Sequence, residues 1–222
     1  KTYDGSPLPY TVTIVPSSIP YQINHSRNGR QLPQADPPVG AGFYSVNVVV
    51  SSGPYSRAVS HNYEINPAPL SIQFSNLDQT YDGNPHPVQV TTTPAGIPLT
   101  LEYGGPNVPP PVEAGTYQVR AISEFPDYQP RTTQTATLVV RKASPTLAFH
   151  SLPTTLAVGT PVTLSATHSS GLGGILFEVS SGNGRVTGNQ LTLADANPVT
   201  VRATHPGNSN YNAASAEITL TA

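Results

Sequence analysis

Short stretches in which apolar and polar residues alternate recur along the whole chain. Between residues 115 and 122, for example, Tyr117, Val119 and Ala121 alternate with polar residues. Other stretches of this kind are SVNVVV (45–50), LSIQF (70–74), PVQVTTT (87–93), PLTLEY (98–103), ILFEVSS (175–181) and PVTVRAT (198–204). A period of two is typical of strands with one buried face. No proline-free stretch of three turns shows a helical period, so the pattern predicts an all-β chain.

A sequence of about 75 residues is repeated. TYDG at Thr2–Gly5 recurs at Thr80–Gly83, and both copies are followed by Pro-x-Pro. Later in each copy, AGFYSVNVVVSSGPY (Ala41–Tyr55) aligns with AGTYQVRAISEFPDY (Ala114–Tyr128). A period of this length with several motifs in the same order indicates two homologous domains in series.

The repeat and a change of pattern at Ala143 predict three modules. The first covers residues 1–67, and its first strand is missing because nothing in it matches LSIQF ahead of the second TYDG. The second covers 68–142. The third covers 143–222 and has evenly spaced strand-like stretches, as a β-sandwich does. The predicted fold class is therefore all-β, with three small Ig-like β-sandwich modules in tandem, two of them homologous repeats.

The repeated Tyr-Asp pair has a structural and a catalytic interpretation. Asp-Gly provides the positive φ of a tight turn, and the tyrosine before it is expected to pack over the core. A catalytic pair would need a partner base, and none is duplicated with it. The structural interpretation is therefore favoured.

Several motifs resemble a known family. TYDG-[SN]-P-x-P, TTTPAGIPLTLEYGG, PPVEAGTYQVRA and TATLVVRKA are similar to the MBG/YDG-type Ig-like repeats of bacterial surface proteins. Residues 143–222 resemble another bacterial Ig-like domain. The resemblance implies all-β modules of long, extracellular, adhesin-like proteins, in tandem and without known catalysis.

Composition excludes several classes of function. The chain has no Cys, which excludes disulfides, thiol catalysis and cysteine zinc sites. Its net charge of −2 gives no reason to expect nucleic acid as a partner. No apolar run reaches the ~20 residues that span a bilayer, so we expect no membrane insertion in this segment. The six histidines are far apart, and no hydrolase, metalloprotease or Walker motif occurs. We expect no metal, no cofactor and no enzymatic activity.

The first module contains the candidate binding residues. Its loop Asn24–Pro38 is longer than the corresponding loop of the second module and is rich in hydrogen-bond donors. The candidates are His25, Arg27, Asn28, Arg30 and Asp36. Arg27 and Arg30 could together bind a carboxylate of an acidic sugar or a protein. The alternative is a solvated hairpin that turns at Asn28.

Two further tyrosines, Tyr10 and Tyr21, have no tyrosine counterpart in the second module. They either belong to a surface special to the first module or are larger core residues, and we favour the core.

The expected function is that of a non-enzymatic spacer in a bacterial adhesin-like surface protein, either at the cell surface or secreted. Its partners would then be the neighbouring modules of the same protein. One alternative is a module that binds a glycan or a host or cell-surface protein. Another is an accessory segment of a large secreted hydrolase.

Overall fold

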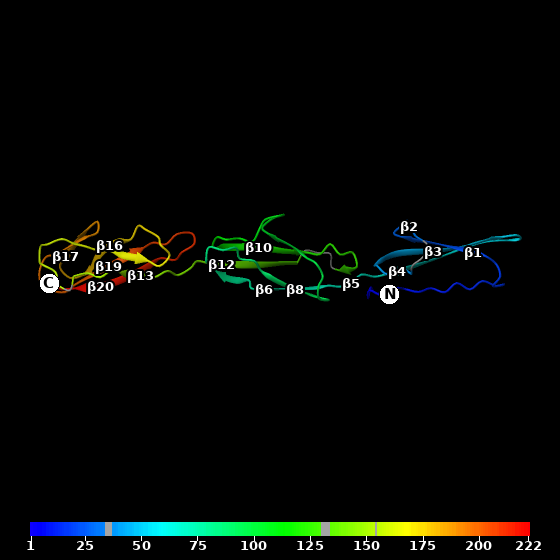
Figure 1. Cartoon of the computed structure of the whole chain (residues 1–222), viewed down its shortest axis with the longest axis horizontal. Coiled ribbons are helices and arrows are strands. Elements are labelled where there is room, and N and C mark those ends of the chain that lie inside the picture. Colours follow the sequence, from blue (N-terminus) through cyan, green and yellow to red (C-terminus); the bar gives the residue numbers. More distant parts are fainter. Residues whose placement is uncertain (34–36, 130–133, 154) are drawn as a thin grey trace. The chain divides into compact units, whose positions relative to one another are not determined.

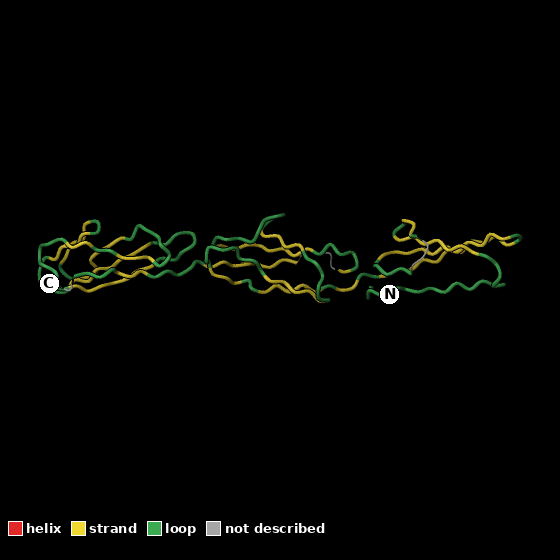
Figure 2. The backbone as a smooth tube through the Cα atoms, viewed as in Figure 1, coloured by secondary structure: helices red, strands yellow, loops and turns green. Residues whose placement is uncertain are grey.

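The computed structural model of the chain describes residues 1–33, 37–129, 134–153 and 155–222. Throughout these residues the backbone forms strands, turns and loops but no helix (Figure 2), so the predicted all-β fold is confirmed. It follows that no described helix could cross a bilayer.

Contacts between residues divide the chain into two compact units, and the division runs through the second module. Unit 1 comprises Lys1–Ser75, Gln89–Val108 and Gln118–Ala136. Unit 2 comprises Asn76–Val88, Pro109–Tyr117 and Thr137–Ala222.

The first module is built on a single antiparallel sheet (Figure 1). Its strands are β1 (Tyr21–Arg27), β2 (Arg30–Leu32), β3 (Gly42–Ser52) and β4 (Tyr55–Ile65), in the order β2-β1-β3-β4. Tyr44, Val46 and Ile65 are buried on one face, as the period of two predicts for β3. This sheet carries the candidate hairpin, which is β1 and β2 with their turn.

One face of this sheet is only partly covered. Residues 10–14 line a groove together with β3 and β4 but are not part of a strand. The corresponding segment of the second module is β8 (Gln89–Thr93), which pairs with β6 (Ser71–Ser75). No described strand takes the place of β6 in the first module, and Val59 in the groove is 53% exposed.

This difference explains why Tyr10 and Tyr21 are not core residues, contrary to our preferred interpretation. Tyr21 is 44% exposed and Tyr10 is 37% exposed. In the second module, the counterpart of Tyr21 is Leu99, which packs against buried Leu70 and Ile72. The first module has no such side chains in the described residues to cover the aromatic rings.

The second module contains β5 (Ala68–Pro69), β6, β7 (Asp78–Thr80), β8, β9 (Thr100–Tyr103), β10 (Gly115–Ile122), β11 (Tyr128–Gln129) and β12 (Gln134–Arg141). They form sheets β7-β12-β10-β9, β6-β8 and β11-β5. Along β10, Val119 and Ala121 are fully buried while Arg120 between them is exposed. The alternation predicted for this strand is confirmed.

The third module contains β13 (Leu147–Phe149), β14 (Val162–Thr163), β15 (Ala166–His168), β16 (Leu176–Ser181), β17 (Gly184–Thr187), β18 (Gln190–Leu193), β19 (Val199–His205) and β20 (Ala214–Leu220). Its sheets are β13-β15, β14-β18-β17 and β16-β19-β20. The core cluster includes Leu164, Leu191, Val199 and Val201, each at most 1% exposed. The stretch PVTLSAT (161–167) is divided into β14 and β15, and buried Leu164 lies between them.

The core of the third module gives a stability prediction. Leu191→Ala removes a side chain that is 1% exposed, and we expect the module to lose about 2–5 kcal/mol of unfolding free energy. Leu176→Ala is the matched control because Leu176 is 64% exposed, and its effect should stay within about 0.5 kcal/mol. Urea unfolding followed by NMR signals of this module measures both. Equal effects would contradict the core assignment.

Candidate functional site in the hairpin and at the module junctions

The candidate loop of the first module begins as a regular β-hairpin. Arg27 on β1 is paired with Arg30 on β2, and Asn28 and Gly29 form the turn between them. Both turn residues have positive φ, 51° and 80°, which is the conformation of a two-residue hairpin turn. The local fold is therefore the hairpin turning at Asn28 that we gave as the alternative to a binding loop.

His25 points to the interior of the module. It is 3% exposed, its ring shares a hydrogen bond with the Tyr10 hydroxyl, and the two rings pack edge to face at 5.0 Å. A ligand on the surface could not reach it without opening the module.

Arg27 and Asn28 bind to the protein itself. Arg27 donates a hydrogen bond to the carbonyl of Ala41, and its Nη2 lies 3.5 Å from Oδ1 of Asp127. The Asn28 side chain accepts a hydrogen bond from the backbone N–H of Phe43 at 3.0 Å. Arg30 is exposed on β2, and Asp36 lies outside the described residues. The structure therefore brings Arg27 and Asn28 against the start of β3 and does not gather the four described candidates at one place on the surface.

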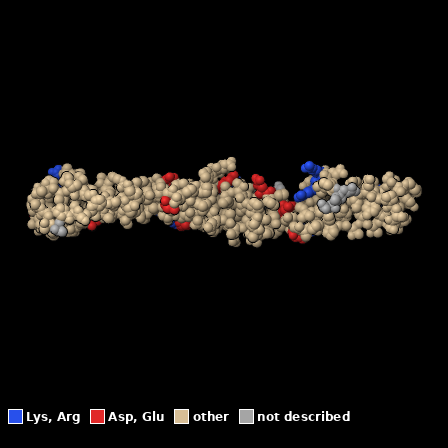
Figure 3. Space-filling model, viewed as in Figure 1, with Lys and Arg blue, Asp and Glu red and all other residues tan. Residues whose placement is uncertain are grey.

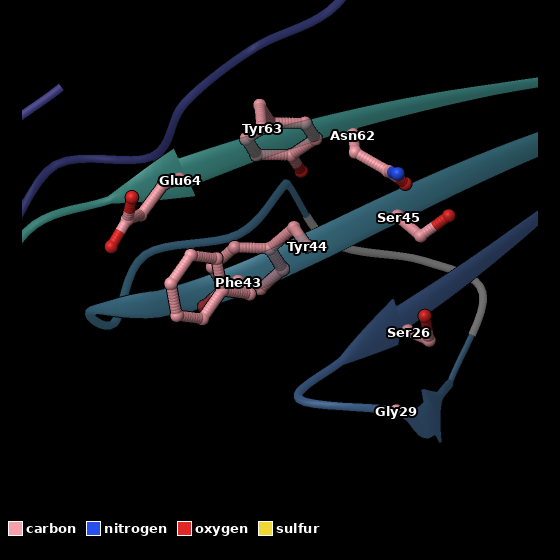
Figure 4. A pocket seen from close by; sticks show the side chains of 8 residues that line it. All are labelled: Ser26, Gly29, Phe43, Tyr44, Ser45, Asn62, Tyr63 and Glu64. Carbon is pink, nitrogen blue, oxygen red and sulfur yellow. The ribbon is translucent and has the colours of Figure 1, made fainter.

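A hollow lies beside this hairpin, on β3 and β4 (Figure 4). Its lining residues are Ser26, Gly29, Phe43, Tyr44, Ser45, Asn62, Tyr63 and Glu64. Tyr44 and Tyr63 stack at 5.3 Å, while Phe43 is 65% exposed. Among the described residues that line it, Glu64 provides the one carboxylate, and none is a histidine, lysine or arginine.

The aspartates of the two TYDG motifs shape turns. Oδ1 of Asp4 accepts the backbone N–H of Ser6 at 2.9 Å, and Oδ1 of Asp82 accepts that of Asn84 at 2.8 Å. A hydrogen bond from the Lys1 side chain and those from Ser6 hold the pKa of Asp4 well below its usual range. These carboxylates act as ionised turn acceptors.

The tyrosine of each TYDG packs on a tyrosine much later in the chain. Tyr3 meets Tyr128 edge to face at 5.5 Å within unit 1. Tyr81 meets Tyr211 in the same geometry at 5.3 Å within unit 2. We expect Tyr3 and Tyr81 to pack over the core. Each is half-buried in the structure, and the tyrosine ring that it contacts belongs to the module that follows.

The residue before each of these later tyrosines binds a backbone N–H at an equivalent position of the repeat. Oδ1 of Asp127 accepts the N–H of Ala41 at 2.7 Å, and Oδ1 of Asn210 accepts the N–H of Ala114 at 3.0 Å. Ala41 and Ala114 occupy the same position of the repeat, at the start of AGFY and AGTY. We call the two sets junction 1 (Tyr3, Arg27, Ala41, Asp127, Tyr128) and junction 2 (Tyr81, Glu113, Ala114, Asn210, Tyr211).

Backbone hydrogen bonds complete both junctions. Next to Tyr128, the N–H of Ala68 donates to the carbonyl of Asp127 at 2.8 Å. Next to Tyr211, the N–H of Ala143 donates to the carbonyl of Asn210 at 2.9 Å. The linkers between modules are Asn66–Leu70 and Arg141–Pro145. Each linker is thus tied to the loop that carries the Asp or Asn side chain.

Comparison with known families identifies the repeat. A family model described as "MBG domain" matches the chain twice, over residues 1–69 and 70–144. The chain belongs to the MBG domain family. Residues 145–222 lie outside both matches, so the bacterial Ig-like identity of the third module stays a prediction. No curated protein matches the chain in sequence.

Two solved structures are similar to this chain, which contains two MBG modules. They are immunoglobulin domains 1–5 of Sidekick-1 and the insect immune protein hemolin, each with 14% identity. The similarity covers 90% and 89% of this chain, and 51% and 67% of theirs, with TM-scores of 0.29 and 0.30. The chain thus spans about half the length of the Sidekick-1 structure. TM-scores this low carry no argument about function.

Sequence reasoning missed Asp127 and Asn210, although a signal for them was present. Asp127 directly precedes Tyr128 and Asn210 directly precedes Tyr211, and both side chains can accept hydrogen bonds. The signal was a recurring Asp/Asn-Tyr pair in two modules that otherwise differ. The role of this pair becomes clear only from the group that the Asp or Asn side chain binds. That group is a backbone N–H, 86 residues away for Asp127 and 96 residues away for Asn210.

The polar contact of junction 1 gives a second prediction. Asp127→Ala leaves the buried N–H of Ala41 without its acceptor and Arg27 without its ion pair. We expect a loss of about 1–3 kcal/mol in the unfolding free energy of unit 1. Chemical denaturation measures it, with Glu124→Ala as the control because that exposed side chain lies three residues earlier. Indistinguishable variants would contradict the assignment.

The aromatic contact of junction 2 gives a third prediction. A double-mutant cycle with Tyr81→Ala and Tyr211→Ala should give a coupling energy of about 0.5–1.5 kcal/mol. Either single substitution already removes the edge-to-face contact, so the double variant cannot lose that contact a second time. The control cycle pairs Tyr81→Ala with Tyr128→Ala, which belongs to the other junction, and should be additive within about 0.5 kcal/mol. Additivity in both cycles would exclude an energetic role for the ring pair.

Proposed function

We propose that the chain is a non-enzymatic structural segment of a bacterial, extracellular, adhesin-like surface protein. In this role its MBG modules hold binding or catalytic domains of the parent protein away from the cell surface. The observation that carries the proposal is the repetition of the junction. In both copies a TYDG tyrosine meets a later tyrosine, and an Asp or Asn side chain binds the alanine N–H.

The chemistry of the junctions suits a spacer. A spacer must keep the angle between successive modules fixed, and three different contacts restrain more directions than one linker does. The linkers are short and contain proline, which limits their conformations further. Repeating the same contacts in a long array would extend the same restraint from module to module.

The surface and the turns support the non-enzymatic part of the proposal. Only 10% of residues are charged, and most of the face seen in Figure 3 is uncharged. The TYDG aspartates are engaged as turn acceptors, and the hollow on β3 and β4 holds a single carboxylate. Long spacers need a solvated, unreactive surface rather than a cleft with paired acids and bases.

A single-molecule measurement tests the spacer function. The chain has no Cys, so one engineered cysteine in the first module and one in the second can be labelled without background. Energy transfer between the dyes should give one narrow distribution in the parent chain. The distribution should broaden in Asp127→Ala and stay narrow in Glu124→Ala. A broad distribution in the parent chain would contradict the proposal.

Cellular location requires a separate test. Antibodies raised against this segment should stain intact cells of the source bacterium without permeabilisation. Staining that requires lysis would refute the extracellular part of the proposal and leave the junction chemistry unaffected.

One observation favours a second candidate, a module that binds a glycan or a protein. Phe43 is 65% exposed at the hollow, and exposed Arg30 lies on the adjoining hairpin. An aromatic face beside a cation suits an acidic sugar or a carboxylate-bearing peptide. A glycan array with the full chain tests this candidate. Binding that survives Phe43→Ala and Arg30→Ala would place the site elsewhere.

A further inference from the structure

The two junctions are not chemically identical at the position before the alanine. Gly40 precedes Ala41, whereas Glu113 precedes Ala114, and these positions are equivalent in the repeat. The partner side chain also differs: it is Asp127 in junction 1 and Asn210 in junction 2. The two differences are linked by hydrogen-bond chemistry.

Junction 1 uses its partner side chain as an acceptor only. The Asp127 carboxylate accepts the Ala41 N–H and lies beside the guanidinium of Arg27. A Cβ atom on Gly40 would lie 2.8 Å from Nη2 of Arg27 and 3.0 Å from Oδ1 of Asp127. Arg27 therefore occupies the space that a side chain at residue 40 would need.

Junction 2 requires an acceptor and a donor on one side chain. Oδ1 of Asn210 accepts the Ala114 N–H at 3.0 Å, and its Nδ2 donates a hydrogen bond to Oε2 of Glu113. A carboxamide meets both requirements. An aspartate in its place could accept from Ala114, but it would set a second carboxylate against Glu113 with no proton to share. Asn210 is 8% exposed, so solvent screens that repulsion only from the side of Glu113, which is exposed.

We propose that these side chains determine which neighbouring modules form a rigid junction with each other. An MBG module with glutamate before its Ala-Gly accepts a following module with Asn before the junction tyrosine and rejects one with Asp. A module with glycine there and an arginine on its β1 strand accepts a following module with Asp. Specificity of this kind comes from the repulsive element as much as from the attractive one. The inference rests on the proposed function, because it assumes that the junctions restrain the modules.

The test compares the tumbling of the second and third modules in the full chain by ¹⁵N relaxation. In the parent chain the two modules should tumble with one correlation time. Asn210→Asp should abolish this common tumbling, so that the third module moves independently. Unchanged chemical shifts of the core residues Val199 and Val201 would show that the variant third module still folds.

A second variant makes the test specific. Adding Glu113→Gln to Asn210→Asp supplies a carboxamide opposite the new carboxylate, and common tumbling should return. At junction 1, Asp127→Asn keeps the acceptor for Ala41, so the first and second modules should still tumble together.

The outcomes separate the inference from the proposed function. Independent tumbling in the parent chain would overturn both. Common tumbling in the parent chain that persists in Asn210→Asp would overturn the inference alone. Failure of Glu113→Gln to restore common tumbling would also overturn it, because the loss would then not arise from the two carboxylates.

Discussion

The junctions between modules depend on one hydrogen bond. A backbone N–H of one module donates it to a side chain of the next module. Ala41 is 6% exposed, and the acceptor for its N–H is the carboxylate of Asp127. A buried N–H without a partner costs as much as a lost hydrogen bond, so a second module that covers Ala41 must also supply an acceptor for its N–H. This dependence agrees with the division of the chain into compact units, which runs through the second module rather than along its borders.

The repeated motifs support this contact from both sides. The aspartate of TYDG closes a turn that fixes the tyrosine before it, and the ring then packs on the tyrosine of the next module. The hydroxyls of Tyr44 and Tyr117 donate hydrogen bonds to the carbonyls of Gly40 and Glu113, at 2.6 and 2.8 Å. These bonds hold the loop that presents the alanine N–H. The repeated stretches thus act together in joining modules.

Alternation of apolar and polar residues was enough to predict the strands and the all-β fold, because the period of two depends only on neighbouring residues. The same alternation also indicates that His25 is not a surface binding residue. His25 lies two residues after Ile23 on β1 and so shares its inward face. The role of Arg27 could not be predicted from the sequence, because its partner Asp127 lies 100 residues away. The exposure of Tyr21 depends on a strand that covers its counterpart only in the second module.

Amide hydrogen exchange of Ala41 and Ala114 in the unmodified full chain tests the central claim most directly. Neither N–H is part of a strand, so protection by its own sheet is not expected. If Asp127 and Asn210 bind these groups, both amides should exchange much more slowly than in an unstructured peptide, and Ala41 should lose this protection in Asp127→Ala while Val119 keeps its own. Exchange of both amides at the unprotected rate in the parent chain would contradict the account.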